Sequence, residues 1–81
     1  MIIKKKMTKK TGQAILNKAK SFFGPEGNGL TIASEGNCCI TFTGGGGYLT
    51  VTIDDSSEGN TRIEVETREW DYLAKKFMET A

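Results

Sequence analysis

The sequence predicts a two-layer α+β domain, in which two helices cover one face of a four-stranded antiparallel meander in the order α-β-β-β-β-α. Three stretches carry this prediction, because apolar and polar residues alternate along each of them: 38–43, 48–54 and 61–67. Such alternation is typical of a strand with one face in a core and the other in water. The segments before and after the sheet instead place apolar residues at helical spacing.

The turns between these strands agree with the alternation. A two-residue turn at Gly45-Gly46 sets Phe42 opposite Leu49, and a loop over 56–60 sets Ile53 opposite Ile63, so the apolar side chains share one face. The other expected pairs are Ile40 with Val51, Cys38 with Ile53, Thr43 with Tyr48, Thr41 with Thr50, Cys39 with Thr52, Val51 with Val65 and Asp54 with Arg62.

The first strand of the meander is expected over 30–34. A three-residue loop at 35–37 pairs Ile32 with Ile40 and Leu30 with Phe42, whereas a two-residue turn at 36–37 leaves Leu30 and Ile32 in water. We favour the first register, because burial of each of these side chains is favourable by about 1.5 to 3 kcal/mol.

The first helix is predicted over 11–23, with Thr8 or Thr11 as its N-cap and Gly24-Pro25 ending it. Its basic, amphipathic character fits either a membrane-surface or partner-binding helix, or a helix that covers the sheet. We favour the second reading, because one sheet face needs a cover. The residues expected on its buried face are Ile15, Leu16, Ala19, Phe22 and Phe23.

The second helix is predicted after the last strand, with Thr67 as its N-cap. Acidic residues come early in this segment and lysines later, which is the distribution that the helix dipole favours. The expected buried stripe is Trp70, Leu73, Ala74 and Phe77, with Tyr72, Met78 and Glu79 beside or away from it.

Charge divides the 81-residue chain into two parts. Residues 1–25 hold seven lysines and no acidic residue, whereas residues 26–81 hold four basic and ten acidic residues. We therefore expect a basic flexible tail over 1–10, followed by a single domain over 11–81. Such asymmetry favours an anionic partner.

The composition argues against the common enzyme chemistries. Histidine is absent, which removes Ser-His and Cys-His nucleophile pairs and histidine metal sites. We expect no enzyme activity, no cofactor and no metal. An enzyme is kept only as a further alternative to a binding function. It would use Cys39 or the carboxylates Asp54, Glu64 and Glu66, which the alternation places on the open face, the sheet face away from the helices. The run Gly44 to Gly47 is interpreted as a hairpin tip rather than a phosphate loop, because a strand and not a helix follows it.

The two cysteines are adjacent, so we expect reduced thiols and a cytoplasmic protein, with Cys38 in the core and Cys39 on the open face. No stretch has the roughly 18 apolar residues of a membrane-spanning helix, and the N-terminus does not resemble a signal peptide.

These features together favour a small non-catalytic module that binds another protein, present as a monomer or weak homodimer. The alternative function is low-specificity nucleic-acid binding through the basic N-terminal segment, which would weaken steeply with salt. The candidate contact residues are Tyr48, Thr41, Thr50 and Thr52 on the open sheet face, and Lys4, Lys5, Lys6, Lys9 and Lys10 in the basic segment.

Overall fold

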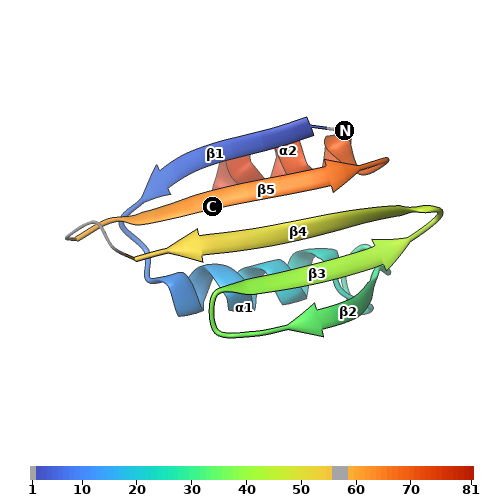
Figure 1. The fold of residues 1–81 in the computed structure, drawn as a ribbon, viewed down its shortest axis with the longest axis horizontal. Coiled ribbons are helices and arrows are strands. Elements are labelled where there is room, and N and C mark those ends of the chain that lie inside the picture. The colour runs from blue at the N-terminus through green and yellow to red at the C-terminus, as the bar shows by residue number, and fades with distance from the viewer. Residues whose placement is uncertain (1, 56–58) are drawn as a thin grey trace.

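The computed structural model describes residues 2–55 and 59–81, which form one antiparallel sheet with two helices packed on one of its faces (Figure 1). The predicted α+β class is confirmed, but the sheet has five strands rather than four, in the spatial order β1-β5-β4-β3-β2. The elements are β1 (Ile2–Thr8), α1 (Gly12–Phe23), β2 (Thr31–Glu35), β3 (Cys39–Gly44), β4 (Gly47–Asp54), β5 (Thr61–Arg68) and α2 (Asp71–Thr80).

The additional strand lies where the sequence suggested a basic flexible tail over 1–10. β1 runs antiparallel to β5, from Ile3 opposite Glu66 to Thr8 opposite Thr61, and forms one edge of the sheet. The alternation expected of a strand is missing here, because Lys4, Lys5 and Lys6 are consecutive and place polar side chains on both faces of the strand. Pairing with a distant strand overrides this weak local preference, as is common for strands.

The predicted register of the central meander is confirmed. Phe42 lies opposite Leu49 and Ile53 opposite Ile63, which aligns the apolar side chains of β3, β4 and β5 on the face that the helices cover. Of the predicted loop over 56–60, residues 56–58 lie outside the described residues. The other confirmed pairs are Ile40 with Val51, Thr43 with Tyr48, Thr41 with Thr50, Cys39 with Thr52, Val51 with Val65 and Asp54 with Arg62.

The predicted register between β2 and β3 is wrong. Ile32 lies opposite Phe42 rather than Ile40, and Glu35 lies opposite Ile40. The register shifts between Ile32 and Ser34, where β2 holds one residue more than β3. Such a bulge reverses the alternation of the strand beyond it, so residue spacing alone could not give the pairing. Leu30 is nevertheless buried, as its apolar side chain required.

The core lies between the sheet and the two helices, which contact different halves of the covered face. α1 packs on β3 and β4, and α2 packs on β5 and β1 (Figure 1). Phe23 of α1 joins the layers, because its ring centroid lies 5.4 Å from that of Phe42 and 5.0 Å from that of Phe77. The predicted buried face of α1 is confirmed for Ile15, Leu16, Ala19 and Phe23, with Phe22 partly buried.

The start of α1 is as predicted, whereas the start of α2 is not. The Thr11 hydroxyl caps α1 by accepting a hydrogen bond from the backbone N–H of Ala14 at 3.2 Å. Thr67 does not cap α2, because it is a buried residue of β5 whose hydroxyl donates to the Tyr48 carbonyl at 2.7 Å. α2 instead begins at Asp71. Met78, which was expected outside the buried stripe of this helix, is only 9% exposed.

The four consecutive glycines form the hairpin tip between β3 and β4. Gly45 and Gly46 have φ angles of +55° and +84°, which a two-residue hairpin turn requires and which side chains disfavour. A Cβ on Gly47 would lie 2.2 Å from the Arg68 carbonyl oxygen, and a Cβ on Gly44 would lie 2.8 Å from Leu30 Cδ2. Backbone geometry and close packing together therefore account for the whole run.

Candidate interaction surface

The face of the sheet opposite the helices is uncovered, and we call it the open face. The strand register determines which side chains share it, because alternate residues of each strand point to the same side. Its members include Ile3, Lys5 and Met7 of β1, Arg62, Glu64, Glu66 and Arg68 of β5, Tyr48, Thr50, Thr52 and Asp54 of β4, and Cys39, Thr41 and Thr43 of β3.

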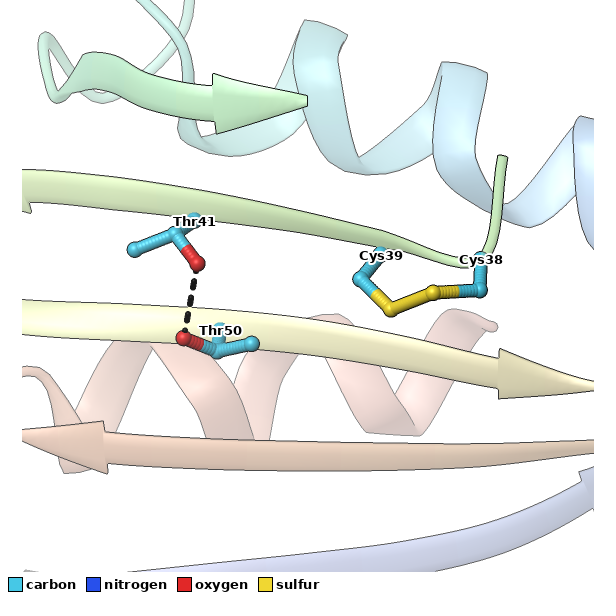
Figure 2. Close-up of a disulfide and its surroundings, with 4 residues drawn as sticks. All are labelled: Cys38, Cys39, Thr41 and Thr50. Atoms are coloured by element: carbon cyan, nitrogen blue, oxygen red, sulfur yellow. Dashed lines mark hydrogen bonds between the residues drawn. A yellow bond between two sulfur atoms is a disulfide. The ribbon is translucent and has the colours of Figure 1, made fainter. Parts of the chain in front are cut away.

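The four candidate contact residues predicted on the sheet do lie together on the open face. Thr41 and Thr50 are cross-strand neighbours whose hydroxyl oxygens are 3.0 Å apart in a hydrogen bond (Figure 2). Thr52 lies opposite Cys39. All of these side chains are half-buried by their neighbours in the sheet. They form a flat polar surface with few apolar groups.

Tyr48 is tied to the next strand rather than free to project from the face. Its hydroxyl donates a hydrogen bond to Glu66 Oε2 at 2.7 Å. This bond, with smaller contributions from burial and from the charge of Glu66, raises the pKa of Tyr48 above its ordinary value of 10.0. The hydrogen bond therefore joins the Tyr48 side chain on β4 to Glu66 on β5.

The five candidate lysines do not act as one basic surface. Lys5 lies on the open face, where its Nζ is 3.7 Å from Glu64 Oε1, and Lys4 and Lys9 are exposed. Lys6 and Lys10 turn to the other side of the sheet, where they contact α2. The predicted cluster is thus divided between the two faces.

The C-terminal end of α2 collects three lysine side chains. Lys6 Nζ donates to the Met78 carbonyl at 2.7 Å, and Lys10 and Lys18 both donate to the Thr80 carbonyl. These bonds satisfy carbonyl groups that a helix end leaves without intrahelical donors, and the positive charges suit the negative end of the helix dipole. Burial, followed by the charges of Lys10 and Lys6, lowers the pKa of Lys18.

The sequence interpretation missed two apolar residues of the open face. Ile3 is 52% exposed and Met7 is 49% exposed, and both flank Lys5 on the edge strand β1. A hollow lined by Lys5, Lys6, Met7 and Arg62 lies at the Met7 end of this strand. Their spacing of i and i+4 in an extended segment would have placed them on one face, had residues 2–8 been interpreted as a strand.

Cys38 and Cys39 are joined by a disulfide bond, which corrects the prediction of reduced thiols (Figure 2). Cys38 was also expected in the core but is exposed, whereas Cys39 lies on the open face as predicted. The reason is that β3 begins at Cys39, so the Cys38 side chain need not follow the alternation of the strand. The disulfide also removes one argument for a cytoplasmic location.

The open-face carboxylates are engaged with neighbouring strands. Glu64 pairs with Lys5, Glu66 accepts the hydrogen bond from Tyr48, and Asp54 lies opposite Arg62 of β5. Within residues 2–55 and 59–81, no group of three or more cysteine or acidic side chains is arranged to hold a metal ion. The same part of the chain contains no helix of the length and apolar character that crossing a membrane requires.

Fold and surface define a two-layer α+β protein with one sheet face covered by helices and the other open. No protein-family model matches the chain, and no curated protein shows significant sequence similarity to it.

Proposed function

We propose that this chain is a small non-catalytic module that binds another protein through the β1 side of its open face. The observation that supports this best is the exposure of Ile3 and Met7, at 52% and 49%, on the same face of an edge strand. Single exposed apolar side chains are ordinary. Here two such side chains share one face of one strand, and a hollow lies at Met7. Methionine is also enriched at protein interfaces.

The partner that this patch suits is an extended acidic segment. β1 ends the sheet, so no described strand pairs with its outer side, and its backbone can accept an added strand. Lys4, Lys5 and Arg62 supply positive charge along this edge. Edge lysines discourage indiscriminate pairing, and the same charges favour a strand that carries acidic residues.

Protein binding is favoured over nucleic-acid binding because of how the lysines are used. Lys6, Lys10 and Lys18 already donate to carbonyl groups of α2, which leaves fewer cations to line a phosphate backbone. Pairing of β1 with β1 of a second copy would bring like charges together, so we propose a monomer or at most a weak homodimer. The cytoplasmic location is a separate part of the proposal.

Affinity capture from native lysate tests the proposal, when the wild type is compared with three variants. Ile3→Thr with Met7→Thr removes the apolar patch and keeps residues that favour strands. Tyr48→Ala with Thr50→Lys alters the distant half of the open face. Tyr72→Ala is the control, because Tyr72 is 67% exposed on α2.

The expected result is a protein that the wild type and Tyr72→Ala capture and that Ile3→Thr with Met7→Thr does not. Amide exchange along β1 should slow when that protein is added, because an added strand protects the edge. Capture that is insensitive to the β1 variant would show that this surface is wrong. Salt-sensitive binding of labelled DNA or RNA, lost on changing Lys4, Lys5 and Lys9 to glutamine, would favour the nucleic-acid alternative instead.

A further inference from the structure

The disulfide between Cys38 and Cys39 is accessible from solvent. It lies where the loop after β2 enters β3, with Cys38 exposed and Cys39 half-buried on the open face (Figure 2). Cys39 shares this face with Thr41, because alternate residues of β3 point to the same side. Because Cys38 is exposed, an incoming thiolate can reach its sulfur without unfolding the protein.

The backbone around the pair is held by bonds that do not involve sulfur. The backbone N–H of Ile53 donates to the Cys38 carbonyl at 2.8 Å, and the N–H of Gly36 donates to the Cys39 carbonyl at 2.8 Å. The strand pairing of Cys39 with Thr52 adds a third constraint. None of these contacts involves sulfur, so we expect them to persist when the disulfide opens and to keep the two thiols side by side.

We propose that Cys38 and Cys39 form a reversible two-electron redox site that exchanges with a dithiol donor. A thiolate of the donor attacks one sulfur, the bond between the two cysteines breaks, and the other cysteine leaves as a thiolate that takes up a proton. The second donor thiol then attacks the mixed disulfide. The donor ends as a disulfide, and the protein gains two electrons and two protons as two thiols.

The reduced pair is in addition a chelating dithiol. The described part of the chain offers no third cysteine or acidic side chain beside it to complete a metal site. Two adjacent thiols alone suit a thiophilic centre that needs only two sulfur ligands, such as a monosubstituted arsenoxide. That reaction forms two arsenic–sulfur bonds and releases the arsenoxide oxygen as water, so it is a specific probe for the reduced state.

This site is independent of the proposed protein-binding surface at β1. In a reducing compartment disulfides are mostly transient and serve catalysis or redox sensing. An exposed pair that opens without loss of the fold fits that use, because exposed disulfides are the ones that exchange readily.

The test is mass spectrometry of the intact, folded protein after alkylation with iodoacetamide. Oxidised protein should take up no alkyl group, and protein equilibrated with increasing dithiothreitol should take up two, with the singly alkylated form nearly absent. After reduction, phenylarsine oxide should bind with a stoichiometry of one per chain and should block both alkylations. Reduced glutathione, a monothiol, should give a mixed disulfide as an intermediate.

Cys38→Ser and Cys39→Ser should each take up one alkyl group and lose one-to-one binding of the arsenoxide. If a variant does not fold, the wild-type titration still decides the matter. Two free thiols that persist after treatment with an oxidant such as diamide, or disulfides that form only between chains, would overturn the proposal. Loss of the native circular dichroism spectrum on reduction would also overturn it, because the bond would then be structural.

Discussion

The indole N–H of Trp70 donates a hydrogen bond to the carbonyl oxygen of Gly44 at 3.0 Å, which joins the residue before α2 to the β3–β4 hairpin tip. Trp70→Phe keeps an aromatic ring and removes the donor. We expect the free energy of unfolding to fall by about 1 kcal/mol, the usual net value of such a bond. Urea denaturation measures this change. Tyr72→Phe on the exposed side of α2 is the control, and an equal loss in both variants would contradict the assignment.

Glycine is needed for different physical reasons at two neighbouring positions of the hairpin tip. Gly46 has a positive φ and open space around it, so Gly46→Asn should destabilise by only about 1 kcal/mol, because asparagine is one of the few side chains that adopt this conformation. At Gly47 an added Cβ would lie 2.2 Å from the Arg68 carbonyl, so Gly47→Ala should destabilise by about 2 kcal/mol or more. Thermal unfolding of the two variants compares them directly. Similar melting temperatures would show that the contact at Gly47 relaxes easily.

Removal of residues 1–8 distinguishes an edge strand from a flexible segment. Deletion of β1 uncovers one side of β5, where Ile63 and Val65 are fully buried, and takes away the contact of β1 with α2. We expect a loss of at least about 2 kcal/mol in the free energy of unfolding, comparable to exposing one large apolar side chain. A shortened chain with unchanged stability would contradict the presence of β1.

The hydrogen bond from Tyr48 to Glu66 predicts the direction of a titration. Because the folded-state pKa of Tyr48 is raised above 10.0, the protonated ring stabilises the fold below pH 10, and this contribution is lost as the pH rises through the raised value. Absorbance titration in a Tyr72→Phe background reports Tyr48 alone. Glu66→Gln should move the midpoint down toward 10. A midpoint at or below 10 in the parent protein would contradict the bond.

Two lysines of β1 offer a matched pair of substitutions, because one contacts the end of α2 and the other does not. Lys6 donates to the Met78 carbonyl, whereas Lys4 is exposed at the same face of β1. Lys6→Met should lower the free energy of unfolding by about 1 kcal/mol, and Lys4→Met should change it by less than about 0.5 kcal/mol. Denaturant unfolding at low salt measures both. Equal effects would show that Lys6 does not cap the helix.

Sequence reasoning succeeded where side-chain pattern and turn chemistry agree. The register of β3, β4 and β5 followed from alternation combined with the Gly45-Gly46 turn, and α1 followed from its apolar face and the cap at Thr11. It failed where the alternation of apolar and polar residues is interrupted or missing. The extra residue in β2 shifts every partner beyond it, and a run of lysines in β1 carries no alternation to detect.

The candidate surface was only partly predictable for the same reason. Thr41, Thr50, Thr52 and Tyr48 follow from the register of two strands, and the structure places them together. The division of the lysines between the open face and α2 requires knowledge that residues 2–8 form a strand. The link between Cys38 and Cys39 depends on β3 beginning at Cys39, and strand ends are the least certain part of a prediction from sequence.

The shift in β2 also limits how the molecule can assemble. Growth of a β-sheet filament requires two complementary edge strands on every subunit. Here one edge strand, β2, has five residues and is interrupted by its bulge. Of the two edges, that formed by β1 is the regular one. A chain built in this way can accept a single neighbour and then offers no template for the next, so its complexes should stop at a defined size rather than polymerise.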